Sequence, residues 1–134
     1  MKKFETLEHK ADLKIKAFGK DLKELFENAM IGMFESAKYE GGGKEIKKEI
    51  KVSSLDLPSL LVDFLSEVLY LSEVNHEIYN QIQFRKLTNK NIEGNLFGEK
   101  LKTIRVAIKG VTYHSLDIHQ KKDKTWETTV LFDI

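Results

Sequence analysis

The sequence predicts an α+β fold, a single domain spanning residues 1–134 with two helices and a mostly antiparallel sheet. Apolar residues follow a helical period in only two segments, at 21–39 and 58–74. Alternating apolar and polar residues, which have the period of a strand, fill the segments around these helices. A run of strands follows the second helix, and strands joined without a crossover helix pair antiparallel. No linker rich in proline, glycine or serine divides the chain.

The first half of the chain alternates short strands with the two helices. Two strands are expected at 3–8 and 12–18, and Asp21 is placed to cap the first helix. The three glycines at 41–43 are expected to end that helix and connect it to a strand at 45–55. The helix that follows carries Pro58 near its first turn, where proline is tolerated. It is apolar around much of its circumference, which predicts the most buried helix.

The second half of the chain predicts strands only. Alternation begins at Ile78, and a second strand is expected at 92–97 after a turn near Lys90. A polar connection at 98–102 leads to a strand at 106–118. A charged hairpin turn at residues 121–124 then leads to a last strand that runs to the end of the sequence.

Composition excludes several classes of function. The 134 residues and 15.5 kDa suffice for one core, and 41% hydrophobic with 32% charged residues is typical of a soluble globular protein. The net charge of +1 argues against strong independent binding to nucleic acid. The chain has no cysteine, which excludes disulfides and thiolate sites. It has neither a signal-peptide core nor the roughly 18 apolar residues of a membrane span, so we expect a cytoplasmic protein without membrane contact.

Two aspartates at opposite ends of the sequence suggest a metal site. On the last strand Asp133 lies on the polar face, opposite the face of Val130 and Phe132. The α-carboxylate of Ile134 would stand one residue from Asp133. If Asp12 is brought to the same place, three anionic oxygen groups converge, which suits a hard divalent cation.

The residues alone leave the function open. Asp12 and Asp133 are each compatible with an ordinary structural role, and the four histidines have no clear metal-ligand spacing. The chain has no phosphate-binding loop, no HExxH and no nucleophile elbow. Residue patterns therefore support an α+β domain with a carboxylate cluster, and no more.

The order of several short motifs resembles the archease family over essentially the whole chain. The matching pieces are HKAD at 9–12, LLVDFLSEVLY at 60–70, GNLFGE at 94–99, KGVTYH at 109–114 and the final Asp-Ile. Phe64 and Ser66 stand where the family usually has Trp and Asn, and Lys10 stands where Thr is common. Each motif is weak alone, but their shared order and spacing are specific.

The resemblance implies a fold built of strand-helix-strand-strand modules and a protein that is not itself an enzyme. Archeases assist the RtcB-type RNA ligase of tRNA splicing by promoting its guanylylation and multiple turnover. The implied cofactor is a divalent ion (Ca²⁺, Mg²⁺ or Mn²⁺) held by Asp12, Asp133 and Ile134. The implied partner is that ligase, with its GTP and tRNA substrate reached indirectly, and the position of a family lysine in the 98–109 loop stays open.

Three further residues are expected near the metal site, and two other functions compete with ligase activation. His9, Lys109 and His114 are expected near the site, where they could contact the ligase or nucleotide. The first competing function is a metal-dependent phosphohydrolase that uses the Asp12/Asp133 cluster. The second is a small chaperone or adaptor protein with an incidental ion.

Overall fold

The computed structural model describes residues 1–8 and 12–134, without the side chains of Glu8, His114 and Ser115. It has two helices and seven strands in the order β-β-α-β-α-β-β-β-β. In chain order these are β1 (Phe4–Glu8), β2 (Asp12–Gly19), α1 (Leu22–Ser36), β3 (Tyr39–Ser53), α2 (Leu57–Asn75), β4 (Glu77–Leu87), β5 (Asn91–Ile104), β6 (Gly110–Gln120) and β7 (Trp126–Asp133).

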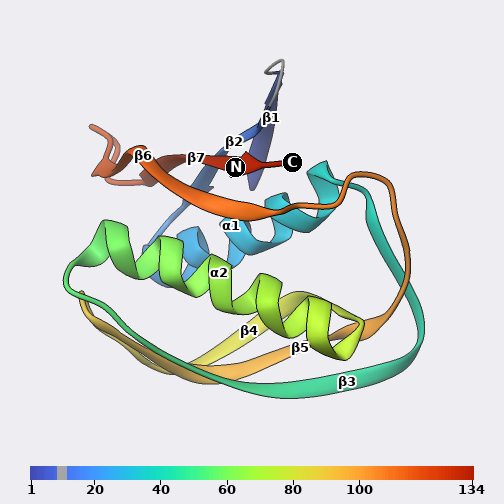
Figure 1. Ribbon diagram of the computed structural model, residues 1–134. Coiled ribbons are helices and arrows are strands. Elements are labelled where there is room, and N and C mark those ends of the chain that lie inside the picture. The colour runs from blue at the N-terminus through green and yellow to red at the C-terminus, as the bar shows by residue number, and fades with distance from the viewer. Residues whose placement is uncertain (9–11) are drawn as a thin grey trace.

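The strands form two separate sheets with both helices between them (Figure 1). One sheet has the order β1-β2-β7-β6 and the other the order β3-β5-β4. Every strand pair in the described part of the chain is antiparallel. The predicted α+β class with two helices is therefore confirmed, and the strands divide into two sheets that face each other across the helices.

The helices begin at the residues that the sequence marks as caps. The carboxylate of Asp21 accepts a hydrogen bond from the Glu24 backbone N–H at 2.9 Å, and that of Asp56 accepts one from Ser59 at 2.8 Å. As expected, α2 is buried around most of its circumference. Phe26 of α1 packs against Phe64 of α2 with ring centroids 5.7 Å apart, which ties the helices into one core.

Two glycine-containing segments differ from expectation. The helix α1 ends at Ser36, so the glycines at 41–43 do not end it but lie inside β3, where the pairing with β5 shifts register between Gly41 and Glu45. The expected polar connection at 98–102 is also wrong, because β5 continues through it to Ile104. The actual connection to β6 is residues 105–109.

Gly98 lies inside β5 because a side chain there would meet the neighbouring strand. A Cβ atom at Gly98 would lie 1.8 Å from the backbone oxygen of Ile78, next to the bulge that β4 forms between Tyr79 and Gln81. Only glycine allows so close an approach of two backbones.

Each strand of the four-stranded sheet buries one face against the helices. Ile15, Val130 and Phe132 are fully buried on the inner face, and the residues between them lie on the outer face. This outer face carries the candidate site. No helix in the described part of the chain is both long and apolar enough to cross a bilayer.

Replacement of Gly98 tests this account of β5. The new Cβ would overlap the Ile78 carbonyl oxygen. We therefore expect Gly98→Ala to lower the free energy of unfolding, measured by urea denaturation, by about 1–3 kcal/mol or more. The matched control is Gly110→Ala, whose Cβ would meet its nearest neighbour at 3.8 Å. Equal stability of the two variants would contradict the close approach of β4 and β5.

Candidate functional site: a carboxylate pair on adjacent strands

The antiparallel pairing of β2 with β7 brings the two predicted aspartates together. Asp12 is the register partner of Asp133, and the next pair along is Leu13 with Phe132. Directly opposite residues on adjacent strands share a face, with Cβ atoms about 4.5–5.5 Å apart. Because Phe132 is buried on the inner face, Asp12 and Asp133 lie together on the outer face.

Two carboxylate side chains stand directly opposite each other in this position. Like charges directly opposite each other on adjacent strands destabilise the pair. Asp133 is exposed and Asp12 is half-buried, and the next outer-face pair along the strands is Lys14 with Leu131. The arrangement can therefore be stabilised by a cation that both carboxylates approach.

The third strand of the site is β6, which reaches Asp133 from the other side. Gly110 is the register partner of Asp133, so no side chain stands between that carboxylate and solvent on β6. The backbone N–H of Lys109 donates a hydrogen bond of 2.7 Å to the Asp133 carbonyl. Lys109, predicted near the site, is thus fixed beside Asp133 by its backbone, and its side chain is exposed.

Hydrogen bonds along residues 105–109 hold Lys109 in this position. The N–H of Val106 donates to the Ala37 carbonyl at 3.0 Å, and that of Ile108 donates to the Tyr39 hydroxyl oxygen at 3.1 Å. Burial raises the pKa of Tyr39 above its usual value, so this hydroxyl stays neutral. Tyr39 therefore acts as a positioning residue for the segment that carries Lys109.

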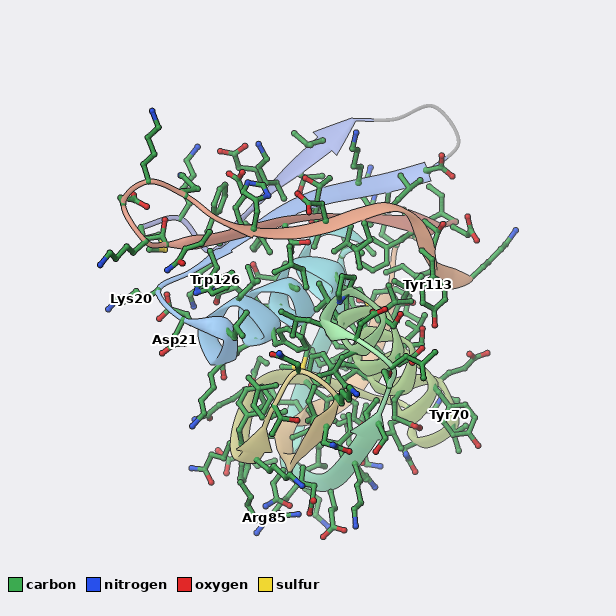
Figure 2. All side chains as sticks on the ribbon, turned by 90° about the vertical axis from the view of Figure 1, so that its left-hand side faces the viewer. Lys20, Asp21, Tyr70, Arg85, Tyr113 and Trp126 are labelled. Carbon is green, nitrogen blue, oxygen red and sulfur yellow. The ribbon has the colours of Figure 1, made fainter. Side chains whose placement is uncertain are left out.

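A second tyrosine ties β6 to α2. The hydroxyl of Tyr113 donates to one carboxylate oxygen of Asp63, and the other oxygen accepts a hydrogen bond from Ser54. Figure 2 shows Tyr113 on the side of the molecule where α2 runs below β6. The hydrogen bond to the Asp63 carboxylate raises the pKa of Tyr113. The contact links β6 to α2.

Sequence reasoning did not single out Tyr39, Asp63 or Tyr113. The signal for two of them was present, because Asp63 and Tyr113 both lie inside motifs that carry the family resemblance. Each looks like an ordinary surface residue until the fold joins them. Tyr39 stands at the start of a strand that the sequence placed later, so its role could not be read from local pattern.

The remaining predicted residues are placed in part. His9 lies outside the described residues, and the side chain of His114 does too, although its backbone belongs to β6. Ile134 follows the end of β7 and is 38% exposed. Within residues 1–8 and 12–134, no three His, Cys, Asp or Glu side chains gather as a metal-binding group. Metal binding by Asp12, Asp133 and Ile134 thus remains a prediction.

The outer face has a second charged cluster, which is separate from the aspartate pair. The His119 imidazole lies 2.8 Å from a carboxylate oxygen of Asp117 and 2.9 Å from one of Glu127. Glu127 also lies 3.7 Å from the Lys16 ammonium. These groups interact with one another, and Asp12 and Asp133 form a separate pair on adjacent strands. Carboxylate oxygens are the donors that hard divalent cations prefer, so the chemistry of the pair fits Ca²⁺, Mg²⁺ or Mn²⁺.

The sequence matches the Archease protein family (MTH1598/TM1083) over residues 4–134. It is 39% identical to the protein archease of Methanosarcina barkeri, over 99% of this chain and 97% of that protein. It is 37% identical to the protein archease of Sulfurisphaera tokodaii, over 90% of this chain and 91% of that protein.

Two solved structures share the fold. The solution structure of Methanobacterium thermoautotrophicum protein 1598 matches with a TM-score of 0.72 and 30% identity over the full length of both chains. The crystal structure of an archease from Thermotoga maritima, described as a possible chaperone, matches with a TM-score of 0.68 over 96% of this chain and 94% of that one. At 22% identity the second likeness concerns the fold alone. Sequence, fold and the order of the motifs agree, and the chain belongs to the archease family.

Proposed function

We propose that this chain is a non-catalytic protein cofactor that activates an RtcB-type RNA ligase by promoting its guanylylation and multiple turnover. The observation that carries the proposal is membership of the archease family over residues 4–134. The fold adds support, because the register of β2 and β7 puts the two family aspartates opposite each other. Both lie on an open sheet face that a large partner can reach.

The aspartate pair fits the divalent ion that the proposal requires. Asp12 and Asp133 would hold the ion, and a third donor is proposed at the α-carboxylate of Ile134. A divalent ion bound there would supply positive charge for the triphosphate and departing pyrophosphate of guanylyl transfer. The chain's own contribution is to orient the two carboxylates through the β2–β7 ladder and to present Lys109 beside them. Lys109, with His9 and His114 as further candidates, would contact the ligase or its nucleotide.

If the aspartate pair holds a divalent ion, Asp133→Asn should stabilise the protein without the ion and make it less stable than the unsubstituted protein when the ion is present. Without divalent metal, we expect Asp133→Asn to raise the free energy of unfolding by about 0.2–1 kcal/mol, because it removes like-charge repulsion across the strands. At a Mn²⁺ concentration about 100-fold above the dissociation constant, the unsubstituted protein should gain about 2.7 kcal/mol that the variant lacks. Urea denaturation in EDTA and in Mn²⁺ measures both values.

The control for this measurement is Asp117→Asn, which removes a carboxylate from the same sheet face but from the His119 cluster. Its response to Mn²⁺ should equal that of the unsubstituted protein. If Mn²⁺ stabilises Asp133→Asn and the unsubstituted protein equally, the ion is not held by Asp133.

Ligase activation should depend on both aspartates. We expect the protein alone to turn over no phosphoester, and to accelerate guanylylation of the cognate ligase when added in less than equimolar amount. Asp12→Asn and Asp133→Asn should each reduce multiple-turnover ligation to near the rate without added protein, because each removes an anionic oxygen donor at nearly constant shape. The assay follows radiolabelled GTP on the ligase and joined RNA product. Phosphoester hydrolysis that survives purification and is lost in Asp12→Asn would instead support the hydrolase.

The part of the site at Ile134 has its own test. A short C-terminal extension turns the α-carboxylate of Ile134 into a neutral amide while β7 keeps its pairing with β2. We expect such a protein to bind Mn²⁺ at least tenfold more weakly by isothermal titration calorimetry and to stimulate the ligase poorly. An N-terminal extension of the same length is the control. Undiminished binding by the extended protein would remove Ile134 from the site and leave the aspartate pair intact.

A further inference from the structure

A cavity of about 210 Å³ lies at the end of the molecule opposite the hairpin of β6 and β7. Figure 1 shows this end, where α2 finishes and the β5–β6 connection rises beside the start of β3. The apolar walls of the cavity come from four separate segments: β3, α2, the end of β5 and the 105–109 connection. The wall residues are Tyr39, Leu69, Leu101, Ile104 and Ile108.

The cavity contains an unsatisfied buried hydroxyl. Ser72 is 1% exposed, lines the cavity, and its Oγ has no hydrogen-bond partner. A serine inside a helix commonly donates to the carbonyl four residues earlier, and buried polar side chains nearly always have a partner. Ser72 instead offers both its lone pairs and its proton to whatever enters the cavity.

The lining residues of the cavity include one carboxylate and no lysine or arginine. Glu73 and His76 stand at the mouth, both exposed, and Glu73 is the carboxylate among the lining residues. The whole of α2 contains acidic residues at Asp63, Glu67 and Glu73 and no lysine or arginine. A hydroxyl acceptor inside and a carboxylate at the mouth suit an ammonium or guanidinium group whose methylene stem packs on the apolar wall.

Exposed apolar side chains beside the mouth point to a protein as the source of that cation. Ile104, which lines the cavity, is 42% exposed, and Ala107, which also lines it, is exposed. A small organic cation would leave both in water. A protein that inserts a basic side chain flanked by apolar residues would cover them as well.

We propose that this cavity is a docking site for a protein partner, which inserts a lysine or arginine side chain between Ser72 and Glu73 and covers Ile104 and Ala107 with flanking apolar residues. The site does not include Asp12, Asp133 or Lys109. The proposal stands whether or not the ligase function holds, and its test needs only the isolated protein.

The test is a titration of the ¹⁵N-labelled protein followed by NMR. The probes are n-butylammonium chloride, sodium butyrate, a capped Leu-Lys-Leu tripeptide and a capped Leu-Gln-Leu tripeptide. We expect n-butylammonium to shift the amide signals of Ser72, Glu73 and Ile108 with a dissociation constant of about 1–10 mM, and butyrate to leave them unchanged. The lysine peptide should bind at least threefold more tightly than n-butylammonium and at least tenfold more tightly than the glutamine peptide.

Three outcomes of the titration overturn the proposal. Equal shifts with butyrate and n-butylammonium, or none with either, would show that the cavity does not select a cation. A lysine peptide that binds no better than n-butylammonium would show a small-molecule cation site, and docking of a protein would be wrong.

Two substitutions separate binding from folding. Ser72→Ala and Glu73→Gln should each weaken binding of the lysine peptide at least threefold, while Glu67→Gln, on the same helix but outside the cavity, should leave it unchanged. Ser72→Ala removes an unsatisfied buried hydroxyl, so its melting temperature should equal or exceed that of the unsubstituted protein. Unchanged peptide binding in both variants, with signals that show an intact fold, would refute the site.

Discussion

The pairing of β2 with β7 is the interaction on which the rest of the structure depends. It joins the second strand of the chain to the last, so the register of this one pair sets the contacts on both faces of the sheet. On the inner face it packs Leu13 and Ile15 against Phe132 and Val130, the last three fully buried. On the outer face it sets Asp12 opposite Asp133. A slip of one residue would expose the apolar set and turn the carboxylates inward, so core burial fixes the geometry of the acidic pair.

The surroundings of the pair are held by contacts that reach from the opposite side of the molecule. Residues 105–109 run from β5 in one sheet to β6 in the other, and their backbone N–H groups donate hydrogen bonds to the Ala37 carbonyl, the Tyr39 hydroxyl and the Asp133 carbonyl. Each such hydrogen bond contributes only about 0.5–1.5 kcal/mol net. Together these bonds join the start of β3, the end of α1 and Asp133, and residues 105–109 also form one wall of the cavity at Ser72. The two surfaces proposed for binding therefore share a supporting segment while using different side chains.

The sequence predicted the fold class and the polar-face position of Asp133 because both follow from local periodicity. Alternation along 126–134 put Asp133 on the polar face, and the helical period identified α2 as the buried helix, as the structure confirms. The division into two sheets could not be predicted, because the choice of strand partners depends on contacts far apart in the chain.

The expectations for two glycine-containing segments were wrong for a related reason. At Gly41 and Gly98 glycine serves a register shift and a close strand approach, and the same residue in isolation resembles a turn. The hydrogen bond between Tyr113 and Asp63 likewise exists only once β6 lies over α2.

The central claim, that the β2–β7 register builds a divalent-cation site, is tested most directly by anomalous diffraction from crystals grown with Mn²⁺. The account predicts one strong anomalous peak between Asp12 and Asp133, with manganese about 2.0–2.6 Å from carboxylate oxygens, by the distances usual for hard cations with oxygen ligands. The His119 cluster of the same sheet face provides an internal comparison, because Asp117 and Glu127 are also carboxylates. A peak at that cluster, with none at the aspartate pair in ordered crystals, would contradict the claim.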